Sequence, residues 1–377
     1  MTEKSNSETL TTYTILNALV EGSVFGILRY LIQPQMMGWE FLHYLLLYNL
    51  IAFGLMPLAG IITDLTSNKH LFVQTGVLMI FCGLLFPSHF TRVVPLALGL
   101  KIKTVFCGVG TALFRAAASG VILRRSEHRN RDIGLFLGAA PLGTAIVLLK
   151  PTFAYYFIPI AMFTAARDDH CREFGEMLAA REAPKRRKKH LTVIAAVGLT
   201  VVLMAAAAFR FLIGEAVDLV FTSDKKLILL FSLALILGRA LGGFLSDLDG
   251  NVILSLVSVG LGGYFLLAAD GRTLWIAAGL FFLNLTLPAL YHSAAELIPR
   301  APAFAAGLIS VTALPAAITA RRFPADGMFE KMLTVEGLLL NGAALITCAV
   351  LLYELPVVKI ILEKKKTKKE RKKEESK

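Results

Sequence analysis

Ionisable side chains interrupt several long apolar stretches of this 377-residue chain, and they are the residues best placed to do chemistry there. A charge inside a lipid bilayer costs about 2.5–3.5 kcal/mol, so each is a functional candidate. The basic members would hold an anionic group, and the acidic members would bind and release a proton. The set comprises Glu21, Arg29, Lys101, Lys103, Arg115, Arg210, Arg239, His292 and Glu296.

Three of the cations share one stretch, and helical spacing separates them. Lys101 lies about 40° from Arg115 around a helix, whereas Lys103 lies about 200° from Lys101. Thr104 and Thr111 fall on the stripe between Lys101 and Arg115. We therefore expect Lys101 and Arg115 to face one polar cavity and Lys103 to point elsewhere.

The two carboxylates are the expected proton-coupling groups. Glu21 stands near the middle of the first stretch, with Arg29 eight residues further on. Burial would keep Glu21 protonated, whereas a close arginine would hold it ionised. A permanent ion pair that fastens two helices is the alternative. Glu296 follows His292 by one helical turn, and Asn284 precedes both on a slowly rotating stripe.

Neither a metal site nor an enzyme active site is expected. A catalytic zinc ion needs three protein ligands, and the histidines other than His292 fall in loops or at the ends of apolar stretches. The four cysteines show no ligand spacing. We also find no phosphate-binding loop and no nucleophile motif, so we expect no cofactor and no catalytic residue.

The elements that carry these residues are membrane-spanning helices. Hydrophobic residues make up 56% of the chain and charged residues 18%, which is unlike a soluble domain. About 20 apolar residues are needed to cross a bilayer. Twelve stretches satisfy this, near 12–33, 41–63, 71–90, 94–122, 133–150, 152–166, 191–213, 226–245, 252–269, 273–298, 302–320 and 334–358.

The loop charges predict the orientation of these spans. Basic residues gather in the central segment 167–190 and in the tail 359–377, which holds ten lysines and arginines against four glutamates. The positive-inside bias therefore places both termini in the cytoplasm. The tail has no aromatic residues between its charges, so we expect it to meet anionic lipid and not nucleic acid.

The chain also repeats itself at long range. LRYLI at 28–32 matches FRFLI at 209–213, and ALFRAAAS at 112–119 matches ALYHSAAE at 289–296. The GIITD motif at 60–64 matches GFLSD at 243–247. These matches run in the same order along the chain, so we predict two six-helix bundles of common descent, 1–166 and 191–358. The match between 112–119 and 289–296 places His292 where the first bundle has Arg115.

With six plus six spans, a basic central loop and two GxxxD motifs, the sequence resembles the major facilitator superfamily, and in particular a bacterial branch of it. The resemblance implies an all-α polytopic fold with two pseudo-symmetric six-helix bundles. It also implies a gate at the cytoplasmic side formed by Gly60, Asp64 and Lys69, and by Gly243, Asp247 and Arg239 in the second copy. The basic residues that usually follow GxxxD are missing here except for Lys69.

In that family the aspartate faces the N-terminal end of a helix in the other bundle. A helix N-terminus carries about half a positive charge and favours a carboxylate. Pro302, near the start of a span, is well suited to the first turn of the helix that faces Asp64. The alternative is that each aspartate caps only its own neighbours.

The resemblance implies a secondary transporter in the cytoplasmic membrane that works by alternating access and is a monomer. The expected substrate-binding residues are Arg115, His292, Lys101, Arg29, Arg210 and Asn284. Because basic residues dominate, we expect a small anionic or zwitterionic solute, with proton coupling through Glu21 or Glu296. A multidrug exporter, a membrane-embedded enzyme and a scaffold or sensor that transports nothing are the alternatives.

Overall fold

The computed structural model describes residues 3–35, 38–66, 68–86, 95–125, 129–166, 193–215, 224–247, 251–269 and 272–322, and within them every regular element is a helix. The first half contains α1 (Glu3–Gly26), the π-helix η1 (Ile27–Ile32), α2 (Gly38–Gly54), α3 (Met56–Leu65), α4 (Lys69–Leu85), α5 (Leu96–Arg125), α6 (Arg129–Leu149) and α7 (Phe153–Ala166). The second half contains α9 (Val193–Glu215), α10 (Lys225–Asp247), α11 (Asn251–Leu267), α12 (Thr273–Asn284), α13 (Leu287–Leu297), α14 (Pro302–Val311) and α15 (Ala313–Arg322).

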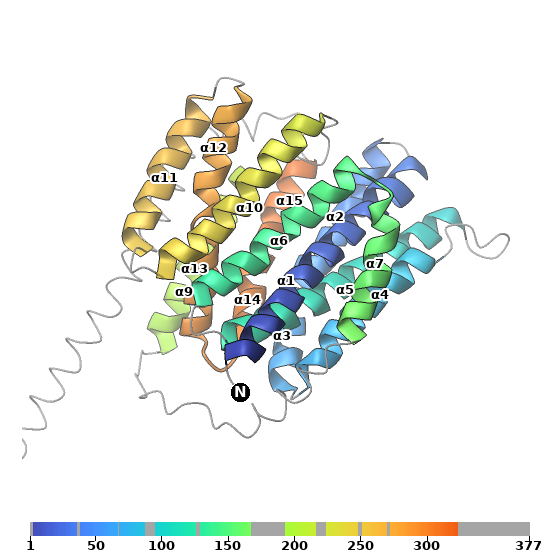
Figure 1. Ribbon diagram of the computed structural model, residues 1–377, viewed down its shortest axis with the longest axis horizontal. Coiled ribbons are helices and arrows are strands. Elements are labelled where there is room, and N and C mark those ends of the chain that lie inside the picture. Colours follow the sequence, from blue (N-terminus) through green and yellow to red (C-terminus); the bar gives the residue numbers. More distant parts are fainter. Residues whose placement is uncertain are drawn as a thin grey trace, which may run out of the picture.

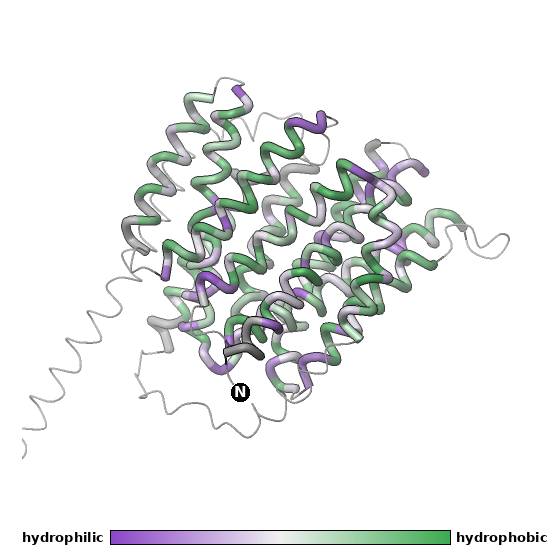
Figure 2. The backbone as a smooth tube through the Cα atoms, in the orientation of Figure 1, coloured by the Kyte–Doolittle hydropathy of each residue, from purple (hydrophilic) through white to green (hydrophobic). Residues whose placement is uncertain are grey.

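The helices run side by side, with the first half on one side of the molecule and the second half on the other (Figure 1). By length and composition, six of the described helical segments can cross a membrane. Hydrophobic residues colour most of each helix, and hydrophilic residues gather toward the helix ends (Figure 2). Large apolar side chains such as Leu58, Phe163 and Leu229 are exposed, as expected for a surface that faces lipid.

The first eleven predicted spans each coincide with described helices. The twelfth, 334–358, lies outside the described residues, as do the basic segment 167–190 and the tail 359–377. The multi-pass helical architecture is therefore confirmed, whereas the count of twelve and the two basic segments remain predictions.

Three of the spans that we predicted as single helices are broken. The first break separates α2 from α3 at Leu55, the second separates α12 from α13, and the third separates α14 from α15 at Thr312. Pro57 and Pro288 stand in the first turns of α3 and α13, where the missing N–H of proline ends the preceding hydrogen-bond ladder. These breaks lie beside the cavity described below.

The two halves meet along α6 and α10, and along α14 with α3 and α5. Glycine makes the approach possible. A Cβ on Gly60 would lie 2.6 Å from the carbonyl oxygen of Ala303, and a Cβ on Gly243 would lie 2.9 Å from the Cα of Arg131. The glycines of the two GxxxD motifs therefore pack backbone to backbone against the opposite half.

Candidate functional site: a polar cavity between the halves

A cavity of about 360 Å³ lies between the two halves. Its walls come from α1, α2, α5 and α6 on one side and from α9, α10 and α12 to α15 on the other. Its charged residues are three arginines and one glutamate, which leaves two net positive charges. Its polar and charged lining residues are Asn17, Glu21, Tyr48, Asn49, Arg115, Ser119, Thr144, Arg210, Ser232, Arg239, Asn284, Tyr291 and Ser310.

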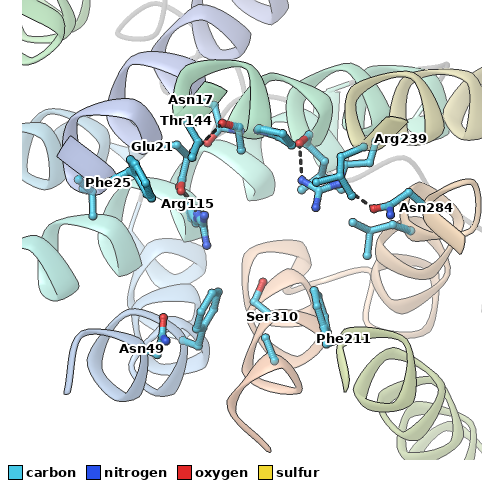
Figure 3. Close-up of a pocket in the computed structure, with 18 of the residues that line it drawn as sticks. Asn17, Glu21, Phe25, Asn49, Arg115, Thr144, Phe211, Arg239, Asn284 and Ser310 are labelled. Carbon is cyan, nitrogen blue, oxygen red and sulfur yellow. Dashed lines mark hydrogen bonds and ion pairs between the residues drawn. The ribbon is translucent and has the colours of Figure 1, made fainter. Parts of the chain in front are cut away.

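Glu21 and Arg115 form an ion pair on the wall made by the first half. Nε and Nη2 of Arg115 both lie 2.5 Å from Oε1 of Glu21, as Figure 3 shows. The Arg115 guanidinium also stands over the ring of Phe53, 5.4 Å from its centroid, a distance at which a cation is attracted to a ring face. Glu21 therefore neutralises the charge of Arg115 within the protein.

A second cluster, Arg210–Asn284–Arg239, occupies the wall made by the second half. Arg210 donates through Nη2 to Oδ1 of Asn284, and Arg239 donates to the same oxygen through Nε at 3.1 Å. Nε of Arg210 also donates to the carbonyl of Leu283 at 2.9 Å. That carbonyl is in the last turn of α12, where a helix leaves its C=O groups without helical partners. The break between α12 and α13 therefore provides an anchor for Arg210.

Arg239 also reaches across to the first half. Its Nη1 donates to the carbonyl of Leu137 in α6 at 2.9 Å. Figure 3 shows Arg239 and Asn284 on the opposite side of the cavity from Glu21 and Arg115. The wall from the first half is therefore neutral overall, because Glu21 and Arg115 neutralise each other. The wall from the second half carries two cations, Arg210 and Arg239.

A pair of reciprocal contacts, which we call the latch, joins the two halves outside the cavity lining. Oδ2 of Asp64 accepts a hydrogen bond from the backbone N–H of Phe304 at 2.9 Å, and Oδ2 of Asp247 accepts one from the N–H of Arg131 at 3.1 Å. Phe304 and Arg131 are each the third residue of their helix, α14 and α6. Each aspartate thus supplies a carboxylate to the N-terminus of a helix in the opposite half, where the helix dipole favours negative charge.

The latch at Asp64 is reinforced by two cations. Lys69 Nζ lies 3.5 Å and Arg124 Nη2 lies 3.2 Å from Oδ1 of Asp64. Arg124 also donates to the carbonyl of Arg300 in the other half at 3.4 Å. The sequence motif indicated Lys69 but not Arg124, which comes from the end of α5. Of the predicted gating set, Gly60, Asp64, Lys69, Gly243 and Asp247 lie at the latch, whereas Arg239 lies in the cavity.

Comparison of the sequence with protein-family models and with curated proteins finds no match. Comparison of the structure does find likeness. A variant of the E. coli fucose:proton symporter FucP is similar with a TM-score of 0.57 and 14% identity, over 91% of this chain and 98% of that chain. FucP in the outward conformation, described as a major facilitator superfamily transporter, is similar with a TM-score of 0.59 and 12% identity over the same shares of both chains.

The chain has the major facilitator fold. The all-helical, multi-pass architecture that the sequence resemblance implied is thereby confirmed, whereas the division into two six-helix bundles remains a prediction. In this example of the major facilitator fold, the GxxxD carboxylates face helix N-termini of the opposite halves, as the resemblance also implied.

The cavity of this major facilitator fold does not contain all the residues that we expected to bind substrate. Arg115, Arg210 and Asn284 line it. Lys101 is exposed and lies outside the lining, and Arg29 instead donates to Oε1 of Gln33 at 2.6 Å. The interpretation of Lys101 as a cavity residue was wrong because α5 extends beyond the cavity, so that a residue four turns from Arg115 is near the helix end.

His292 and Glu296 also lie outside the cavity lining, with Nε2 of His292 3.8 Å from Oε1 of Glu296. The adjacent residue, Tyr291, faces the cavity in their place and shares a 2.8 Å hydrogen bond with Ser310. The repeat aligned His292 with Arg115, but α5 is continuous whereas its counterpart is broken between α12 and α13. Arg115 and His292 therefore occupy equivalent positions in the repeat but do not both face the cavity.

Proposed function

We propose that the protein is a secondary active transporter that moves a small anionic or zwitterionic solute across the cytoplasmic membrane by alternating access. The single observation that carries this proposal is a polar cavity between the two halves of the chain, with three arginines and one glutamate in its lining. In transporters of this architecture, substrate sites lie near the bilayer midplane between the repeats.

The latch supplies the gate that alternating access requires. It holds the two halves together at one end through Asp64 and Asp247. We take that end as cytoplasmic, with both termini on the same side, because the loop charges favour this orientation. In this proposal the latch shuts the cytoplasmic end, and transport would require Asp64 and Asp247 to leave the helix N-termini.

Glu21 supports a further part of the proposal, namely that solute transport is coupled to proton movement. The Glu21–Arg115 pair is half-buried in the cavity wall. A motion that separates the two groups would leave the carboxylate of Glu21 without its cation, and in this proposal a proton then takes the place of Arg115. A proton affinity that depends on conformation links proton binding to the movement of the halves.

The lining disfavours a multidrug exporter of lipophilic cations, because such ligands would meet a cavity of net positive charge. A scaffold or sensor with no transport activity remains the second candidate, and the basic tail would then carry its signal.

The test is uptake into proteoliposomes that contain the purified protein, with protein-free liposomes as the control. The panel holds radiolabelled phosphate, malate and glutamate as anionic and zwitterionic solutes, fucose as a neutral sugar, and tetraphenylphosphonium as a lipophilic cation. We expect protein-dependent uptake of at least one anion or zwitterion. Uptake of tetraphenylphosphonium alone would indicate an exporter of cations, and no flux of any solute would support the scaffold.

A further inference from the structure

Two guanidinium groups share one amide oxygen in the wall of the cavity. Oδ1 of Asn284 accepts from both Arg210 and Arg239, and the Asn284 amide nitrogen donates to the carbonyl of Leu280 at 2.8 Å. The Asn284 oxygen therefore joins the two arginines, while its amide nitrogen ties the side chain to the preceding turn of α12. Arg210 is 4% exposed and Asn284 is 3% exposed, so the cluster is a built part of the cavity wall.

The positive charge of this cluster is not neutralised by the part of the protein that the structure describes. There, the hydrogen-bond acceptors of both arginines are uncharged, namely the carbonyls of Leu283 and Leu137 and the amide of Asn284. The C-terminal end of α12 contributes about half a negative charge. Set against two guanidinium charges, this leaves more than one positive charge in a dry site, which is costly unless an anion joins it.

Donors remain for such an anion. The hydrogen bonds that Arg210 makes with described residues use Nε and Nη2, and those of Arg239 use Nε and Nη1. This leaves Nη1 of Arg210 and Nη2 of Arg239, both on residues that line the cavity. A carboxylate or phosphate presents two or more acceptor oxygens, and arginine is the residue best matched to that geometry.

We propose that Arg210, Asn284 and Arg239 form an oxyanion subsite that binds a carboxylate or phosphate group. The proposal deepens the proposed function, on which it rests, by assigning the charge recognition to the second half. Arg115 is excluded from this role because Glu21 already neutralises it at 2.5 Å. The uncharged part of the same ligand would then face the Glu21–Arg115 wall.

The test is thermal unfolding of the purified full-length protein in detergent, with inorganic phosphate and malate as two separate probes. Malamide, the neutral diamide of malate, is the matched control, and chloride keeps the ionic strength constant. We expect phosphate or malate, but not malamide, to raise the unfolding temperature in a saturable way. The probe with the tighter apparent Kd identifies the group as phosphate-like or carboxylate-like.

Variants assign the effect to the cluster. Arg239→Gln and Arg210→Gln should each weaken the apparent Kd about tenfold or more, as expected for the loss of one charged hydrogen-bond donor. Lys101→Gln removes one positive charge from an exposed residue outside the cavity lining and should keep the wild-type Kd. If the buried Arg210→Gln variant does not fold, the half-buried Arg239→Gln carries the test.

Unchanged affinity in Arg239→Gln, or no stabilisation of the wild type by either anion, overturns the subsite. The result is separable from the transport assay. Flux with an unchanged Kd in Arg239→Gln would keep the proposed function and reject the subsite. Anion binding that Arg239→Gln removes, together with no flux of any solute, would keep the subsite and reject transport.

Discussion

Oε1 of Glu21 lies 2.5 Å from both Nε and Nη2 of Arg115, so an ion pair joins α1 to α5 in the wall of the cavity. The two nitrogens converge on one carboxylate oxygen and not on two. The pair is 12% exposed at Glu21 and 20% exposed at Arg115, so water reaches it only in part. The geometry of this pair allows the effects of substituting Glu21 or Arg115 on transport and stability to be predicted.

Glu21→Gln should abolish accumulation driven by a pH gradient while leaving exchange down a solute gradient intact. Glutamine keeps the shape of the side chain but cannot release a proton. Accumulation and exchange of the transported anion in proteoliposomes measure the two activities separately. The matched control is Glu296→Gln, which removes an exposed carboxylate outside the cavity lining. Gradient-driven uptake that survives in Glu21→Gln but is lost in Glu296→Gln would transfer the coupling role to Glu296.

Arg115→Ala should destabilise the protein more than Glu21→Gln, Arg115→Ala together. The single change leaves a carboxylate in a largely dry site without its cation, a loss of about 3–5 kcal/mol when one partner of a buried pair is removed. Arg115→Lys should retain part of the stability, because a lysine can reach a single oxygen. The four unfolding temperatures form a double-mutant cycle. Additive effects of the two single changes would mean that the pair contributes no coupling energy.

The parts of the structure that could be predicted are those encoded by local patterns. Apolar runs of about 20 residues located the helices, and the family resemblance that rests on the GxxxD repeat implied that Asp64 faces the N-terminus of a helix in the opposite half. The partner of Glu21 could not be found in this way. Arg29 is close in sequence, whereas Arg115 is 94 residues away and is brought near only by packing of α5 against α1.

The arginine cluster was only partly visible in the sequence for the same reason. Arg210 and Asn284 were recognisable as polar residues at membrane depth, but their contact depends on the break that ends α12 at Asn284. The stretch 273–298 was predicted as one helix, so neither the break before Pro288 nor the rotation of α13 after it was foreseen. That rotation replaced His292 with Tyr291 in the cavity lining.

Gly60→Ala should weaken the latch and favour opening at that end. The added Cβ would lie 2.6 Å from the Ala303 carbonyl oxygen and 2.7 Å from the Phe304 Cα. Both are backbone atoms, so they can move away only if the main chain shifts. Overpacking of this kind costs about 1–3 kcal/mol, and separating the halves would relieve it. Spin labels on Leu65→Cys and Arg300→Cys, two exposed positions at the latch end, report the separation as a distance distribution.

Gly263→Ala is the matched control for this experiment, because among the described residues no atom outside the local helix backbone lies within 4 Å of a Cβ at that position. It makes the same chemical change without the clash and should leave the distance distribution unchanged. Identical distributions in Gly60→Ala and Gly263→Ala would show that close packing of Gly60 against Ala303 does not control the latch.

Lys103→Met should lower the unfolding temperature, whereas Lys101→Met should leave it unchanged. Lys103 is 4% exposed and donates through Nζ to the carbonyl of Leu84 at 3.3 Å, in the last turn of α4. A lysine at a helix C-terminus satisfies a carbonyl that has no helical partner and complements the helix dipole. Methionine keeps most of the buried volume but leaves that carbonyl unpaired, which costs about 1–3 kcal/mol.

Lys101 is exposed on the same helix and provides the control. Helical spacing alone placed Lys101 in the cavity and pointed Lys103 elsewhere, and it did not indicate the hydrogen bond from Lys103 to α4. Equal unfolding temperatures for the two variants would show that the Lys103–Leu84 hydrogen bond does not hold α5 to the end of α4.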